Sequence, residues 1–164
     1  MSLQRIIRLV LEDLIPQAEQ KNIDVGMAND TDIDITADEI ALKILIKNLV
    51  DNAIRYTPKN GRVDLSIDVT ERIATLRIVD TGPGIQETDR QRVFDAFFRV
   101  LGNEQAGSGL GLSIVKTAAD QMGATIELSH ANPSPPCGLR VAVKFKNFSA
   151  HPSANSEHPH HLRK

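Results

Sequence analysis

Two neighbouring stretches in which apolar and polar residues alternate constrain the fold of this chain most strongly. Residues 63–69 carry an apolar side chain at every second position, and residues 74–78 do so again after the polar stretch 70–72. A period of two is typical of strands that bury one face. The two stretches therefore predict an antiparallel hairpin whose apolar face must be covered by other parts of the chain.

Three stretches with helical periodicity can provide that cover. Apolar residues recur at intervals of three and four in residues 3–18, 36–56 and 110–122. Pro16 is expected to kink or end the first helix. Thr36 is expected to begin the second, because Thr36 and Glu39 have the spacing of a capping box.

Shorter alternating or apolar segments complete the sheet. They cover residues 23–27, 33–36, 125–129 and 139–145. The expected fold class is α+β: a two-layer sandwich with about three helices on one face of a mixed, mostly antiparallel sheet. Residues 1–148 form the expected single domain, and the polar, His- and Pro-rich stretch 149–164 is expected to be a disordered tail.

Composition excludes several classes of function. The 19 basic and 21 acidic residues give a net charge of −2, so no broad positive surface is expected to bind nucleic acid. The one cysteine, Cys137, cannot form an intrachain disulfide, which fits a reducing compartment such as the cytoplasm. No stretch has the roughly 20 apolar residues of a membrane span.

Asn48 and Asn52 are unusual for the second helix. They are four residues apart and fall on what we take to be its apolar stripe, so both amides are expected to face the core side. That stripe is assigned to Ile40, Ala41, Ile44, Leu45, Leu49 and Ala53. A buried amide needs hydrogen-bond partners. The partner is either a neighbouring loop or a polar ligand, and two amides in register favour the ligand.

Asp80 is the second unusual residue. Counting by twos from Leu76 and Ile78 places its carboxylate on the apolar face of the strand, where it needs donors. One reading is a turn in which Asp80 bonds the loop that follows it. The other is an acceptor for a ligand N–H, with Gly82 and Gly84 leaving room for a flat ring.

A glycine-rich stretch opens the third helix. Residues 107–111 read GSGLG, and the free N–H groups of a helix start favour an anion such as phosphate. The stretch lacks the Gly-Lys-Ser/Thr ending of a P-loop and the spacing of a dinucleotide-binding fold. Residues before it, about 100–108, show no periodicity and are expected to form a mobile loop.

Four motifs together resemble the N, G1, F and G2 boxes of sensor histidine kinases. They are NLVDNAIRYTP at 48–58, DTGPGI at 80–85, FDAFFR at 94–99 and GSGLGLSIVK at 107–116. Their order and spacing also match. The resemblance is to the catalytic, ATP-binding domain of bacterial two-component sensors, in the superfamily that includes gyrase and the Hsp90 chaperone. It implies a Bergerat-type ATP-binding fold in which residues of about 100–108 form a lid.

The resemblance also implies ATP and Mg²⁺ as cofactors and a set of nucleotide contacts. These are Asn48, Asn52, Arg55, Tyr56, Asp80, Gly82, Gly84, Ile85, Gly107, Ser108, Gly109, Leu110, Gly111 and Leu112. Asp80 would accept a hydrogen bond from the adenine 6-amino group, with Ile85 and Leu112 as apolar cover. Tyr56 would lie along the adenine or the ribose.

At the phosphate end, the resemblance implies that Asn52 ligates Mg²⁺ and that Asn48 supports the same network. Arg55 would contact a phosphate, and the glycines of residues 107–111 would offer backbone N–H groups. Arg99 would hold the lid hinge or approach the terminal phosphate, although a solvated surface arginine is an equal alternative. Asn48, Asn52 and Arg99 are thus the expected catalytic residues.

One position separates branches of the superfamily. Hydrolytic members have a glutamate base four residues before the metal-binding Asn, where this chain has Asn48. An amide cannot take a proton from water, so transfer to a protein histidine is expected rather than hydrolysis. A nucleotide-sensing module without transfer activity is the alternative from a different class.

The family's phosphoacceptor histidine lies on a separate dimerisation helix and is followed by an acidic residue. None of the five histidines here is followed by Asp or Glu. The expected partners are ATP, the dimerisation domain of the parent kinase and, through the parent, a response regulator. The isolated chain is expected to be a monomer that does not phosphorylate itself. The parent is expected to be anchored in the inner membrane, with this domain in the cytoplasm.

Overall fold

The computed structural model of the chain describes residues 1–96 and 111–150. Three helices, two short 3-10 turns and seven strands follow one another within these residues. In chain order they are α1 (Leu3–Gln20), β1 (Asp24–Met27), β2 (Ile33–Ile35), α2 (Glu39–Tyr56), β3 (Arg62–Val69), β4 (Ala74–Asp80), η1 (Glu87–Asp89), η2 (Arg92–Phe94), α3 (Gly111–Gln121), β5 (Thr125–His130), β6 (Leu139–Phe145) and β7 (Phe148–Ala150).

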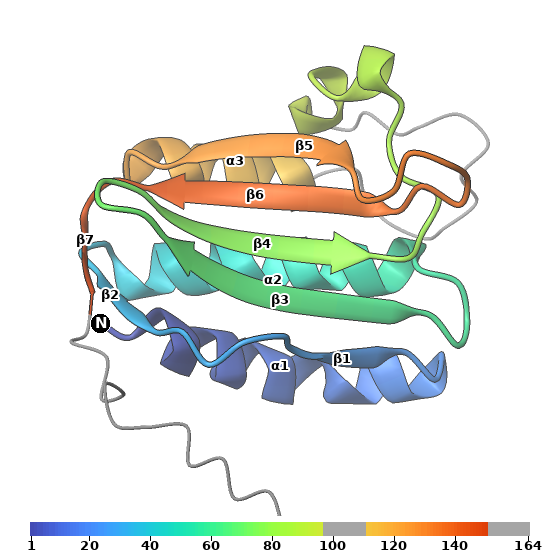
Figure 1. Ribbon diagram of the computed structural model, residues 1–164, viewed down its shortest axis with the longest axis horizontal. Coiled ribbons are helices and arrows are strands. Elements are labelled where there is room, and N and C mark those ends of the chain that lie inside the picture. Colours follow the sequence, from blue (N-terminus) through green and yellow to red (C-terminus); the bar gives the residue numbers. More distant parts are fainter. Residues whose placement is uncertain (97–110, 151–164) are drawn as a thin grey trace, which may run out of the picture.

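Five strands form the main sheet, in the order β1-β3-β4-β6-β5. The β1–β3 pair is parallel, and the other neighbours in this sheet are antiparallel. Figure 1 shows α1, α2 and α3 together on one side of the sheet. The two-layer α+β sandwich and the mostly antiparallel sheet predicted from the sequence are therefore confirmed.

The core lies between the sheet and the helices, as the alternation predicts. Leu65 and Ile67 of β3 and Leu76 and Ile78 of β4 are almost completely buried. The polar residues between them on β3 are only partly buried, and their face of the sheet carries ion pairs such as that between Arg77 and Asp68.

The predicted face of α2 is wrong in part. The buried residues of this helix are Leu42, Leu45, Ile46, Leu49, Val50, Ala53 and Ile54. Ile40 and Ile44 of the expected stripe are 71% and 40% exposed. The helix is apolar on more than one side, and the side rotated toward Ile46 packs on the sheet.

The predicted start of α2 also shifts by two residues. Asp38 is the N-cap, and its side chain accepts a hydrogen bond from the Ala41 N–H at 2.8 Å. Thr36 instead donates its backbone N–H to the Asn147 carbonyl at 3.1 Å. Pro16 does not end α1, which continues to Gln20, and the proline lies on the exposed side of the helix.

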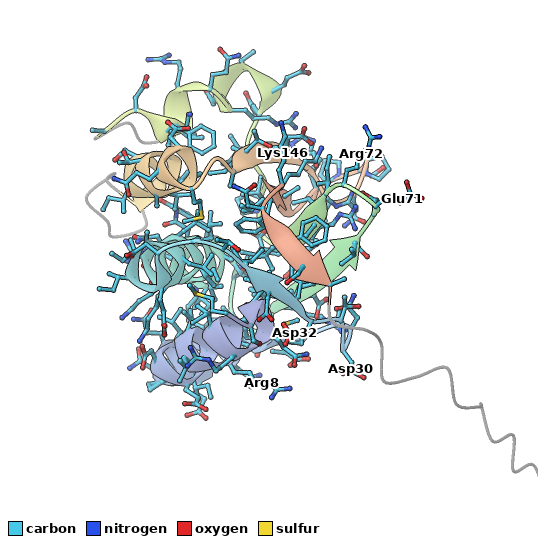
Figure 2. The ribbon with its side chains drawn as sticks, turned by 90° about the vertical axis from the view of Figure 1, so that its left-hand side faces the viewer. Arg8, Asp30, Asp32, Glu71, Arg72 and Lys146 are labelled. Carbon is cyan, nitrogen blue, oxygen red and sulfur yellow. The ribbon has the colours of Figure 1, made fainter. Side chains whose placement is uncertain are left out.

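A two-stranded sheet of β2 and β7 lies at one end of the molecule. Ile33 pairs with Ala150 and Ile35 with Phe148. The expected tail therefore starts later than residue 149, and residues 151–164 lie outside the described residues. Figure 2 views this end, where Glu71 and Arg72 lie in the β3–β4 turn.

Lys21 joins the end of α1 to the end of α2. Its Nζ donates to the carbonyls of Ile54 at 2.8 Å and Arg55 at 2.9 Å, among the last carbonyls of α2. The Lys21 carbonyl in turn accepts from the Asn60 N–H at 2.9 Å. Burial lowers the pKa of the Lys21 ammonium. In residues 1–96 and 111–150, no helix has the length and apolar character needed to cross a membrane.

Candidate functional site

Three elements that carry the sequence motifs end or begin at the side of the fold opposite to β2 and β7 (Figure 1). Tyr56 is the last residue of α2, Asp80 is the last residue of β4, and Gly111 is the first described residue of α3. Motifs that are far apart in the chain therefore meet at one end of the sandwich.

Asp80 is buried, with 5% of its surface exposed. Its Oδ1 accepts two hydrogen bonds, from the Gly82 N–H at 2.9 Å and the Leu139 N–H at 3.1 Å. No group in the described part of the chain donates to Oδ2. One oxygen thus organises the turn, as the first reading predicts, and the second reading, an acceptor for a ligand N–H, stays a prediction.

Burial raises the pKa of the Asp80 carboxyl, because the charged form loses water. The hydrogen bonds from Gly82 and Leu139 act in the opposite direction and favour the carboxylate. A buried carboxyl with a raised pKa at the end of a strand is a candidate functional group.

The glycines after Asp80 have a packing role. A Cβ on Gly82 would lie 2.9 Å from the Tyr56 carbonyl oxygen, so this glycine lets the loop approach the end of α2. Gly84 has a φ of +78°, and its Cβ would lie 2.8 Å from the Gly138 carbonyl oxygen. Protein backbone, and not only a ligand ring, therefore requires glycine at both positions.

Asn48 and Asn52 face the start of α3. They are half-buried at the edge of the helix layer, so the expectation that they point into the core is wrong. The Asn48 Nδ2 donates to the Ile44 carbonyl at 2.8 Å, one turn back in the same helix. A Cβ on Gly111 would lie 3.5 Å from the Asn48 Oδ1 and 3.4 Å from the Asn52 Oδ1.

This arrangement fits Mg²⁺. The two amide oxygens are hard, neutral donors that converge at the beginning of a helix. Residues 1–96 and 111–150 contain no group of three or more His, Cys, Asp or Glu side chains that could hold a metal. The amide oxygens of Asn52 and Asn48 are of the type that could hold an ion whose remaining ligands are phosphate oxygens and water.

Three further candidates lie on the same segments: Arg55 on α2, Ile85 in the loop after β4 and Leu112 on α3. Arg55 pairs with Asp51 one turn earlier, at 3.0 Å. The Ile85 carbonyl accepts from the Arg90 Nε at 3.2 Å, which ties the loop after β4 to the η1–η2 segment. Leu112 is partly buried and packs against the main core.

Five of the expected site residues and the expected lid lie outside the described residues. These are Arg99, Gly107, Ser108, Gly109, Leu110 and the lid of about residues 100–108. Their expected roles stay predictions.

Two parts of the site were not predicted. Leu139, the first residue of β6, supplies its N–H to Asp80, and Lys21 holds the last turn of α2. A backbone N–H has no sequence signature, and a lysine after a helix is common. Gly138 and the three prolines of residues 133–136 are the features before Leu139 that a sequence could have singled out.

The sequence of this chain matches a known protein family and several sensor proteins. The profile of the family described as "Histidine kinase-, DNA gyrase B-, and HSP90-like ATPase" matches residues 37–148. The Swarming motility regulation sensor protein RssA of Serratia marcescens is 36% identical over 118 residues, which are 70% of this chain and 25% of RssA. The chain spans about a quarter of the length of the curated relatives it matches.

Solved structures agree with the sequence relatives. The mycobacterial sensor histidine kinase MprB superimposes with a TM-score of 0.79 at 28% identity, over 92% of this chain and 97% of that one. Full-length ShkA, solved in complex with AMPPNP, gives a TM-score of 0.77 at 27% identity, over 92% of this chain and 31% of ShkA. The chain therefore belongs to the histidine kinase-, DNA gyrase B- and HSP90-like ATPase family, as a catalytic domain of the sensor histidine kinase type.

Proposed function

We propose that this chain positions Mg-ATP for phosphoryl transfer to a histidine on a separate dimerisation domain of its parent kinase. One observation carries the proposal: a buried carboxylate with one uncommitted oxygen, Asp80, lies at the same end of the fold as the converging amides of Asn48 and Asn52. A nucleotide-binding site requires one group that contacts the base and another that contacts the phosphates or their metal ion. The similar kinase ShkA is bound to AMPPNP.

The base end depends on Asp80. A carboxylate is an acceptor only, so its free oxygen fits the 6-amino group of adenine and not the 6-oxo group of guanine. Ile85, in the loop after β4, and Leu112, on α3, are both partly buried and are proposed to provide the apolar cover. Tyr56, held against Gly82 at the end of α2, lies at the edge of the same site.

The phosphate end depends on α2 and the start of α3. Asn52 would hold Mg²⁺, and Asn48, fixed by its bond to Ile44, would support it. Bound Mg²⁺ supplies charge neutralisation for the phosphates. Arg55 adds a guanidinium on the same stretch of helix, where it pairs with Asp51 at 3.0 Å. The residues 107–110 are proposed to add backbone N–H groups, and Arg99 to approach the terminal phosphate.

The protein's contribution is then positioning and charge stabilisation, as in phosphoryl transfer generally. The Asn48 amide cannot remove a proton from water, so a hydrolytic reaction has no base at this position. The nucleophile is proposed to be a histidine of the dimerisation domain. The parent is proposed to be a membrane-anchored two-component sensor that passes the phosphoryl group to a response regulator, with this domain in the cytoplasm.

Mixing the domain with a separately produced dimerisation domain of the parent and γ-labelled ATP tests the proposal. Label on the histidine, absent with Asn52→Ala, is the expected result. The matched control is Asn29→Ala, since Asn29 is an amide far from the site, bonded to the backbone of β3 at Ile67. Tight ATP binding without label on any acceptor would instead identify a nucleotide-sensing module. Rapid release of phosphate without the dimerisation domain would identify a hydrolase.

A further inference from the structure

We propose that the turn between β5 and β6 is a positioning element for base selectivity, and that Gly138 and the N–H of Leu139 fix the orientation of the Asp80 carboxylate. The inference rests on the proposed function, because it assigns a source to the selectivity of the same site. It adds residues 131–139, which lie outside the four motifs that define the site.

The turn is attached to the base-reading loop by two hydrogen bonds. The Leu139 N–H donates to the Asp80 Oδ1 at 3.1 Å. The Gly138 N–H donates to the Gly82 carbonyl at 2.9 Å. One bond therefore holds the carboxylate itself, and the other holds the backbone two residues later.

The approach of the two segments requires glycine on both sides. Gly138 has a φ of +63°, and a Cβ there would lie 2.3 Å from the Asp80 carbonyl oxygen. On the other segment, Gly84 would place its Cβ 2.8 Å from the Gly138 carbonyl oxygen and 3.0 Å from the His130 ring. The nearest atom on each side is a backbone carbonyl oxygen, which cannot move aside as the end of a flexible side chain can, and the His130 ring and the Ala131 Cβ lie beside it.

The turn is also held internally. Its ends are joined by hydrogen bonds from the Ala131 N–H to the Gly138 carbonyl at 3.3 Å and from the Asn132 N–H to the Cys137 carbonyl at 2.7 Å. Three of the residues between them are prolines, whose φ is fixed by the ring. Because the turn is held in this way, the Leu139 N–H that follows it has a fixed position relative to the Asp80 carboxylate.

The consequence for the ligand follows from the two oxygens. With Oδ1 saturated by two N–H groups, Asp80 presents Oδ2 alone, in a fixed direction, to a donor on the base. Without the Leu139 bond the carboxylate can rotate, and its proton affinity rises. A protonated acid can donate, so it no longer discriminates against a 6-oxo group.

Electrostatics supports the same role. Burial raises the pKa of Asp80, and the N–H groups of Gly82 and Leu139 lower it; in the described part of the chain no charged side chain contributes to its shift. Removing one of the two donors therefore raises the pKa further.

Leu139→Pro tests the inference, because it removes the N–H while β6 begins at this residue, and Leu139→Val is the matched control that keeps the N–H. We expect Leu139→Pro to bind ATP about tenfold more weakly than Leu139→Val, because the Asp80 carboxylate is then no longer held in the orientation that meets the base. The preference for ATP over GTP should also fall, and the loss of ATP binding on acidification should begin at higher pH. A merely structural role lowers the melting temperature and leaves the base preference and the pH profile unchanged.

Gly138→Ala provides a second, independent variant, with Gly123→Ala as its control. Gly123 also has a positive φ, of +67°, but a Cβ there meets nothing within 4 Å. Both variants therefore strain the backbone, but only Gly138→Ala displaces the turn between β5 and β6. Gly138→Ala should reduce the ATP-over-GTP preference, and Gly123→Ala should retain it. Unchanged preference and pH profile in both Leu139→Pro and Gly138→Ala would overturn the inference. If the unmodified domain binds neither nucleotide, the proposed function itself fails.

Discussion

Replacing Lys21 by methionine tests how the nucleotide end of α2 is held in place. The Lys21 Nζ donates to the carbonyls of Ile54 and Arg55 at 2.8 and 2.9 Å, in the last turn of a helix whose final carbonyls have no partner within the helix. Methionine keeps the length and apolar character of the side chain but removes both bonds. Arg55 is itself one of the candidate phosphate contacts.

The size of the effect follows from these two bonds. A hydrogen bond from a charged donor contributes about 1.5 kcal/mol at the lower end of its range, so two contribute about 3 kcal/mol. Lys21 is only partly buried, so solvent screening reduces this contribution by about 1 kcal/mol. The expected loss is about 2 kcal/mol, or a melting temperature lower by about 6 °C for a domain of this size.

Lys59→Met is the matched control. Lys59 is exposed in the loop after α2 and has no hydrogen bond or ion pair to another described residue, so the same charge is lost without the two bonds. Thermal unfolding followed by circular dichroism compares the two variants. If Lys21→Met melts within about 1 °C of Lys59→Met, the Lys21 contacts do not hold the helix end.

Three further predictions concern the metal, the packing and the charge at this end of the fold. Asn52→Ala should remove the Mg²⁺ dependence of ATP binding; a titration with the same dependence as the unmodified domain would contradict the metal role. Gly61→Ala should cost about 2 kcal/mol in urea denaturation, because its Cβ would lie 2.2 Å from the Thr57 Cγ2. Thr57→Ser, which removes that methyl group, should recover at least about 1 kcal/mol of this in a double-mutant cycle, whereas strict additivity would refute the contact. Burial raises the pKa of Asp80. The group therefore stabilises the folded, ligand-free state below its ordinary pKa of 3.8, and this contribution to the free energy of unfolding is lost as the pH rises through the raised pKa. Asp80→Asn should lack this pH dependence when unfolding is measured across the range.

The hairpin and its terminal carboxylate could be predicted because both depend on local alternation. Counting by twos from Ile78 fixes the face of Asp80, whatever the rest of the chain does, and the structure buries it there. The convergence of Asn48 and Asn52 on the start of α3 could be anticipated from their helical spacing together with the four ordered motifs.

The orientation of α2 could not be predicted in the same way. Isoleucines occur on several sides of this helix, and periodicity alone does not say which side meets the sheet. Ile46 and Ile54 are buried, whereas Ile40 is exposed, because the positions of α1 and α3 decide which stripe is covered. Tertiary packing, absent from the local pattern, selects among near-equal stripes.

Contacts between distant segments were equally hidden. The pairing of β7 with β2 joins residues more than 100 positions apart, through a strand of ordinary composition. The hydrogen bond from Leu139 to Asp80 uses a backbone N–H, which every residue except proline has. Such contacts can be located once the strands are in register, and not before.

ATP titration by calorimetry, on the unmodified domain and on Asp80→Asn in the presence of Mg²⁺, tests the central claim most directly. The substitution replaces the free acceptor oxygen, or sets an amide donor against the donor of the base, within the same volume. We predict an affinity lower by about a hundredfold, which corresponds to one charged hydrogen bond lost and one buried donor left unpaired. Equal affinity of the two proteins for ATP would show that Asp80 does not read the base and would contradict the account of the site.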